Sequence, residues 1–284
     1  MLHLGFDVSE CDESDKTGRE GLTEIMTKID LNSDLGEGFG PWTMGNDKAI
    51  LDVVTSANIA CGGHAGDPAT MVETLALASE RGVVAGAHPG FADREGFGRR
   101  LIPLSIREVE QLVATQTGAL MGAAALAGAH IRYIKAHGAL ANWAADERPV
   151  ADAIIRATRA VSPELAILAI SGTELEHAAR DAGMTVFSEI FADRGYLSTG
   201  RLVPRNLPGA MIDDPVEAAS RLIEYLSSGL MPTVDGVPIT LDAHSICVHG
   251  DSPGALAMAV HVRQELQKAG IEVAPFLQPT EENR

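Results

Sequence analysis

The chain has 284 residues, of which 45% are hydrophobic and only 4% aromatic, and its net charge is −17. This hydrophobic fraction excludes a disordered chain, and the length suits one large α/β domain or two small ones. The negative charge disfavours binding to nucleic acid or to anionic membranes, so an anionic substrate would need a local basic pocket.

Residues 1–26 differ from the rest of the chain, because they are rich in acidic residues and lack a sustained apolar period. We expect an acidic, disordered extension at 1–26, followed by a single domain over 27–284. The acidic start does not fit a signal peptide, and no apolar run reaches transmembrane length. The three cysteines are scattered without zinc-site spacing. These features together predict a cytoplasmic protein.

Beyond Thr27, short apolar runs typical of strands alternate with helical patterns. The predicted strands are 28–34, 56–61, 83–89, 133–138, 166–171, 185–191 and 245–250. Helix starts are predicted by Asp67-Pro68, Asp214-Pro215 and Ser252-Pro253, and by capping boxes at Ser105–Glu108 and Ser171–Glu174. Seven βα units predict a parallel sheet closed into a barrel, with an open doubly wound sheet as the alternative.

Ionisable side chains gather where the predicted strands end. They are Asp30 and Asp34 of the first strand, His64 after the second, His88, then Lys135 and His137, then Glu189, and finally His249 and Asp251. Parallel α/β folds bring these strand ends to one rim, where such folds build their sites. Burial of so many ionisable groups is costly unless they are used. We therefore expect these nine residues to form a catalytic rim.

Two long connections, at about 89–104 and 191–213, carry an unusual share of the arginines. They hold Arg94, Arg99, Arg100, Arg194, Arg201 and Arg205. One interpretation is a pocket that binds a carboxylate or phosphate, with Arg99, Lys135, Arg194 and Arg205 as its cations. The other is that the arginines pair with nearby acidic residues and only order the loops.

Several common motifs are absent from the sequence. It has no phosphate-binding GxxxxGK[ST] loop and no GxSxG nucleophile elbow. The glycines at 36–40 are followed by Pro41, which breaks the dinucleotide-binding GxGxxG pattern.

Six stretches together resemble one known family. They are IDLNSDLGEGFG (29–40), SANIACGGHAGDPATM (56–71), GAHPGFADREGFGRR (86–100), YIKAHGAL (133–140), EIFADRGYLSTGRLVPR (189–205) and SICVHGDSPGA (245–255). In this order they closely resemble the 5-oxoprolinase A-subunit family, also known as the LamB/YcsF lactam-utilisation family. The resemblance implies an irregular seven-stranded (β/α) barrel akin to the glycoside hydrolase/deacetylase group.

The same resemblance implies an activity and its partners. With B and C subunits, the chain would open the lactam ring of 5-oxo-L-proline to give L-glutamate, at the expense of ATP. A divalent cation such as Mg²⁺ would accompany the nucleotide. Phosphorylation of the lactam oxygen would activate a stable amide toward water, with the rim supplying acid, base and cations.

Two other functions remain open from the residues alone. A metal-dependent amide or N-acetyl hydrolase could use Asp34, His64 and His88 to hold a divalent ion, although the HxxxH spacing of deacetylases is missing. Alternatively, the chain could be a non-catalytic subunit that binds lactam or nucleotide.

Overall fold

A closed ring of parallel strands forms the centre of the computed structural model, which describes residues 28–250 and 254–278. The seven strands of the ring are β1 (Lys28–Leu35), β2 (Ser56–Ala60), β3 (Val84–His88), β4 (Ile131–Ile134), β5 (Ala166–Ile170), β6 (Val186–Phe191) and β9 (Ser245–Cys247). Strand β1 pairs with β2 on one side and with β9 on the other, which closes the ring. The expected seven-stranded (β/α) barrel is confirmed, and the open doubly wound sheet is excluded.

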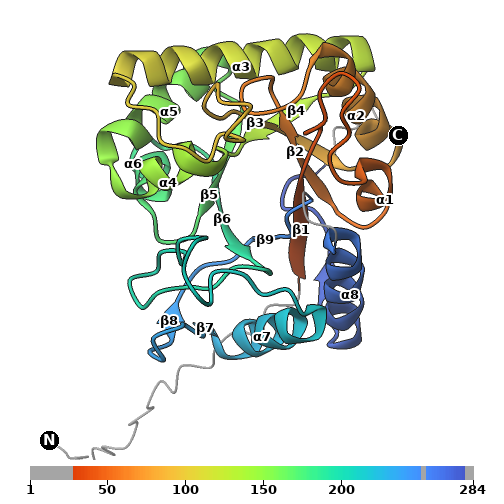
Figure 1. Cartoon of the computed structure of the whole chain (residues 1–284), viewed down its shortest axis with the longest axis vertical. Helices are drawn as coiled ribbons and strands as arrows, with labels where there is room; N and C mark the ends of the chain where they lie inside the picture. The colour runs from red at the N-terminus through yellow and green to blue at the C-terminus, as the bar shows by residue number, and fades with distance from the viewer. Residues whose placement is uncertain (1–27, 251–253, 279–284) are drawn as a thin grey trace, which may run out of the picture.

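Helices cover the outside of this ring, as Figure 1 shows. They are α1 (Asp47–Leu51), α2 (Pro68–Glu80), α3 (Ile106–Ala127), α4 (Gly138–Asp146), α5 (Arg148–Val161), α6 (Glu174–Asp181), α7 (Pro215–Ser228) and α8 (Ala255–Lys268). Buried alanines on α3 and α5, such as Ala124 and Ala153, belong to the hydrophobic core between helices and strands. Their small side chains allow the close packing that an aromatic-poor sequence requires.

Most of the predicted helix starts are confirmed. The Asp67 carboxylate accepts hydrogen bonds from the backbone N–H groups of Ala69 and Thr70, and Asp214 caps α7 in the same way. Ser105 and Glu108 form the expected capping box at the start of α3. These caps satisfy backbone N–H groups that have no partner inside the helix.

The capping box predicted at Ser171–Glu174 is wrong. Thr173 is the N-cap residue of α6, and the Ser171 hydroxyl instead accepts a hydrogen bond from the backbone N–H of Asp242. Ser252 and Pro253 lie outside the described residues, and α8 begins at Ala255.

The strands differ from the prediction mainly at their ends. Strand β4 stops at Ile134 and β9 stops at Cys247, so Lys135, His137 and His249 follow their strands instead of lying within them. Three two-residue strands were not predicted, because such short elements carry no readable period. They are β7 (Leu230–Met231), β8 (Ile239–Thr240) and β10 (Glu272–Val273).

The barrel interior is polar toward the carboxyl ends of its strands. Asp30, Asn32 and Asp34 of β1 all make hydrogen bonds to other strands across the interior. The alternate residues Ile29 and Leu31 are buried in the core beneath the helices. This alternation follows from the two-residue period of a strand.

An apolar cluster fills the opposite end of the barrel. Tyr133 and Leu168 are buried there, and Phe187, Phe276 and Leu277 pack against them. The rings of Tyr133 and Phe276 lie 5.1 Å apart in an edge-to-face arrangement. The C-terminal segment therefore occupies the amino-terminal end of the barrel, leaving the carboxyl end for a site.

The disordered extension expected at 1–26 lies outside the described residues. Among the residues that the structure describes, none of the helices combines the length and apolar character needed to span a membrane.

Candidate functional site at the carboxyl end of the barrel

A cavity of about 640 Å³ lies at the carboxyl ends of the strands. Of the nine residues predicted to form a catalytic rim, six line this cavity: Asp34, His88, Lys135, His137, Glu189 and His249. His64 is buried behind His137, and Asp251 lies outside the described residues. The barrel therefore brings together most of the side chains that the sequence places at separate strand ends.

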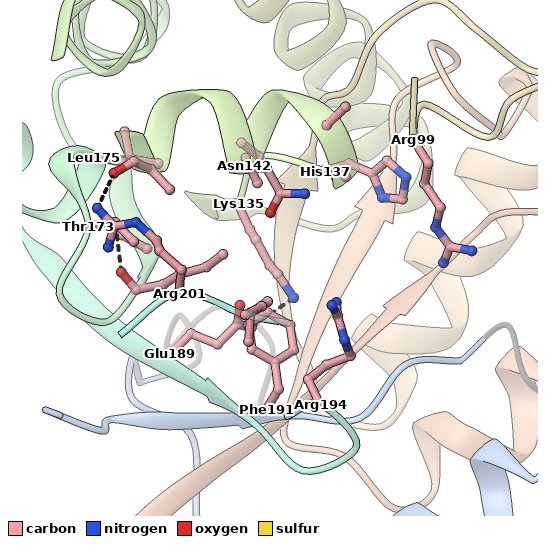
Figure 2. Close-up of a pocket in the computed structure, with 18 of the residues that line it drawn as sticks. Arg99, Lys135, His137, Asn142, Thr173, Leu175, Glu189, Phe191, Arg194 and Arg201 are labelled. Carbon is pink, nitrogen blue, oxygen red and sulfur yellow. Dashed lines mark hydrogen bonds and ion pairs between the residues drawn. The ribbon is translucent and has the colours of Figure 1, made fainter. Parts of the chain in front are cut away.

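Lys135 lies at the centre of the polar residues. Its Nζ is 2.7 Å from Oε1 of Glu189 and donates hydrogen bonds to Oδ1 of Asp34 (3.0 Å) and to Sγ of Cys247 (3.2 Å). Figure 2 shows Lys135 pointing toward Glu189 across the cavity. Burial favours the neutral amine, but the nearby negative charges, with that of Asp34 the largest, outweigh it and raise the pKa of Lys135 well above its usual range. Lys135 is thus an ammonium group.

The two carboxylates beside Lys135 respond differently to burial. For Asp34, the effect of burial is overcome by His88 and Lys135, which hold the pKa of its carboxyl well below the usual range. For Glu189, burial prevails over Lys135, and the pKa of its carboxyl is raised. Oε2 of Glu189 has no hydrogen-bond partner among the described residues. Glu189 is therefore the carboxyl here that is best suited to carry a proton.

Three histidines form a compact cluster at the edge of the cavity. The rings of His64 and His137 are stacked, with centroids 3.6 Å apart and planes 3° from parallel. The His88 ring lies edge-on to His137, and its Nε2 is 3.0 Å from Nδ1 of His137. Glu37 adds a carboxylate, 3.3 Å from Nε2 of His64. Burial lowers the pKa of both His64 and His137 well below the usual range, so both are neutral.

A fourth histidine, His249, is held by a different carboxylate. Its Nδ1 lies 2.8 Å from Oδ2 and 3.0 Å from Oδ1 of Asp193. Although burial opposes it, His249 lowers the pKa of Asp193, so Asp193 is ionised and accepts the Nδ1 hydrogen. Nε2 is then the ring nitrogen of His249 that is left for a ligand, and His249 lines the cavity wall.

Asp30 lies deeper in the barrel than the other rim candidates and does not line the cavity. Its carboxylate accepts hydrogen bonds from the hydroxyls of Thr55, Ser56 and Ser245. Burial raises the pKa of Asp30 to about 6 despite these bonds. Its place in the structure supports a role beneath the site, not in contact with a ligand.

Four of the six loop arginines line the cavity: Arg99, Arg194, Arg201 and Arg205. Arg99 and Arg194 point toward the same space near Lys135, whereas Arg201 lies on the far side of Lys135 (Figure 2). Together with Lys135 they make five cations around the cavity, against the three carboxylates of Asp34, Asp146 and Glu189. This excess of positive charge suits a ligand that carries a carboxylate or phosphate.

The remaining two arginines, Arg94 and Arg100, hold the 89–104 loop in place. Arg100 pairs with Asp93, and Arg94 donates hydrogen bonds to the carbonyls of Gly62 and Gly66. The loop-ordering interpretation thus applies to Arg100, and anion binding by the arginines that line the cavity stays a prediction.

Comparison with known proteins identifies the family. The family model described as LamB/YcsF matches residues 29–281. The chain belongs to the LamB/YcsF family. It is 51% identical to the 5-oxoprolinase A subunit of Azorhizobium caulinodans, with 88% of this chain and 99% of that protein covered. It is 49% identical to the 5-oxoprolinase A subunit of Rhodopseudomonas palustris strain BisA53, with the same coverage.

A solved structure within the LamB/YcsF family has the same fold. The lactam utilization protein from Thermus thermophilus is 42% identical and superposes with a TM-score of 0.82. The match covers 87% of this chain and 99% of that one. The irregular barrel is thus a property shared within the LamB/YcsF family.

The metal ligands suggested by the sequence are arranged differently in this LamB/YcsF barrel. His64 and His88 are grouped with Glu37 and His137, and one ligand atom from each lies within 4.8 Å of the others. Asp34 is outside that group, although its Oδ2 lies 3.3 Å from Nε2 of His88. The chemistry of this His/Glu cluster suits a divalent cation.

Two residues of the site were not among the candidates predicted from the sequence. Glu37 lies in the loop after β1, and Asp193 follows β6, so both are acidic residues after a strand. That signal is present in the sequence, but it does not say which of many loop carboxylates turns inward.

Proposed function

We propose that this chain is the A subunit of an ATP-dependent 5-oxoprolinase, which hydrolyses the lactam amide of 5-oxo-L-proline to L-glutamate. The observation that carries the proposal is the 51% identity to a 5-oxoprolinase A subunit over 99% of that protein's length. The cavity is compatible with it, because it combines cations for an anionic substrate with groups for proton transfer. The two buried cysteines of the chain, Cys61 and Cys247, are free thiols, which is compatible with an enzyme of the reducing cytoplasm.

The proposed reaction couples ring opening to ATP. The γ-phosphoryl group passes to the lactam oxygen and ADP leaves. Water then adds to the ring carbon, and the C–N bond breaks as the nitrogen takes a proton. A second water converts the resulting acyl phosphate to carboxylate and phosphate.

Residues of this chain fit these steps. His249, oriented by Asp193, would accept a proton from water, and Glu189 would donate one to the ring nitrogen. Lys135, Arg99, Arg194 and Arg205 would hold the substrate carboxylate and the transferred phosphate. Because these groups line one cavity, we assign ring opening to this chain. The nucleotide and its Mg²⁺ would be used together with the B and C subunits.

Reconstitution tests the proposal. The purified chain, mixed with its B and C subunits, 5-oxo-L-proline and Mg²⁺, should release glutamate only when ATP is present, with ADP formed in proportion. Omission of this chain alone should abolish glutamate release. Glutamate release at full rate without ATP would favour a simple amide hydrolase. Release that persists without this chain would leave it no more than a binding protein.

A further inference from the structure

Ring nitrogens of two buried histidines face each other at the edge of the cavity. Nδ1 of His88 lies 2.8 Å from the carbonyl oxygen of Lys135, and Nε2 of His137 lies 2.8 Å from the carbonyl oxygen of Phe97. A carbonyl can only accept, so both of these nitrogens carry hydrogens. The other two ring nitrogens, Nε2 of His88 and Nδ1 of His137, lie 3.0 Å apart, and each can offer a lone pair to a metal ion.

Carboxylate oxygens surround the same two nitrogens. Oε1 of Glu37 lies 3.8 Å from Nδ1 of His137, and Oδ2 of Asp34 lies 3.3 Å from Nε2 of His88. All four atoms can act as acceptors, and all are buried. Their mutual repulsion is relieved by a cation among them, either a proton on His88 that faces Asp34 or a metal ion that displaces this proton.

We propose that Glu37, His88 and His137 bind a divalent transition-metal ion of the zinc class. Ligand atoms sit roughly 2.0–2.2 Å from zinc, so neighbouring ligands lie about 3 to 3.5 Å apart. His137 lies 3.0 Å from His88 and 3.8 Å from Glu37, and all three ligand atoms lie within 4.8 Å of one another, so side-chain movements of about 1 Å would bring them to this spacing. Imidazole nitrogens select zinc-like ions, whereas Mg²⁺ prefers oxygen ligands. The site is therefore distinct from a nucleotide-bound Mg²⁺.

The hydrogen bonds from His88 and His137 to carbonyls are a second feature of metal-binding histidines. Such a bond on the distal nitrogen fixes the tautomer and aims the other nitrogen at the ion. Here both carbonyl acceptors belong to backbone that the barrel holds in place, after β4 and in the loop that precedes α3.

His64 lies beside this site but would not bind the ion itself. Its ring is parallel to that of His137, and one ion cannot lie in the planes of two stacked rings. Its Nε2, at 3.3 Å from Glu37, instead orients the carboxylate ligand. His88 and His137 line the cavity, so the ion would face a ligand there.

Zinc binding can be measured on the chain alone, which separates this proposal from the 5-oxoprolinase assay. Chelator-treated protein is dialysed against Zn²⁺ in the presence of excess Mg²⁺, and bound zinc and the melting temperature are recorded. We expect one zinc per chain and a melting temperature raised by zinc. His137→Gln and Glu37→Gln should each weaken zinc binding at least tenfold. His177→Gln, which alters a half-exposed histidine on α6, should bind as the wild type does.

Two further results decide the outcome. If either variant proves unstable, Co²⁺ bound to the wild-type chain should show visible d–d absorption typical of nitrogen and oxygen ligands, displaced by one equivalent of zinc. The proposal is overturned if wild-type protein binds no more zinc than His137→Gln does, or if Co²⁺ gives only the spectrum of the hydrated ion. A hydrogen shared between His88 and His137 would then explain their approach.

Discussion

Asp30 is a carboxylate buried inside the barrel, 1% exposed, with three hydroxyl groups donating to it. Hydroxyl donors stabilise the anion, but burial and the nearby Glu189 favour the protonated form. Burial is the larger effect, and the pKa of Asp30 rises to about 6. A carboxyl with a raised pKa stabilises the fold in acid and loses that contribution as the pH rises.

Replacing this carboxyl should therefore change the pH dependence of stability. The free energy of unfolding of the wild type, relative to Asp30→Asn, should fall by about 2 kcal/mol between pH 4 and pH 6.5 and then level off. Urea unfolding at several pH values measures it. Asp213→Asn, which removes an exposed carboxyl, controls for the loss of one charge. A difference between wild type and Asp30→Asn that stays constant or grows over this range would show that Asp30 is ionised throughout.

The long connection from β6 to α7 is pinned across the cavity by arginines. Arg194 donates to the carbonyls of Val203 and Ala210 within the connection itself. Arg201 reaches out of it, pairing with Asp146 and donating to the carbonyls of Ala145 and Gly172. We expect this connection to act as a lid over the cavity, and Arg201 would then control how readily it opens.

Loss of this clamp should free the connection without unfolding the barrel. In Arg201→Lys, which keeps the charge but not the planar fork, chymotryptic cleavage after Leu197 or Leu202 should be on the order of tenfold faster. Adding 5-oxoproline and ATP should slow cleavage of the wild-type chain. Arg156→Ala, an exposed arginine on α5, should change nothing. Cleavage rates equal in wild type and Arg201→Lys would mean that Arg201 does not restrain the connection.

Elements with a clear period could be predicted from the sequence, whereas their side-chain contacts could not. The alternation in β1 placed Asp30, Asn32 and Asp34 on one face, because a strand allows no other arrangement. Arginine content marked both loops, but charge alone could not distinguish Arg99, which lines the cavity, from Arg100, which pairs with Asp93. That distinction depends on the backbone path of an irregular loop, which has no period.

At the scale of the whole molecule, the two ends of the barrel differ in their side chains. The apolar cluster around Phe276 fills the amino-terminal end, and the cavity occupies the carboxyl end. The cations around the cavity contrast with a net charge of −17, so an anionic substrate is attracted locally. We expect the partner subunits to act on substrate from the carboxyl end.

The central claim is that this cavity opens the lactam ring, and Glu189 tests it most directly. In the complex with B and C subunits and ATP, we measure glutamate release from 5-oxoproline by wild type, Glu189→Gln and the control His177→Gln. Wild type and His177→Gln should release glutamate at similar rates. Glu189→Gln should be slower on the order of a hundredfold or more, because the proton donor for the ring nitrogen is gone, while assembly with the partners is unchanged. Glutamate release at the wild-type rate by Glu189→Gln would contradict the account.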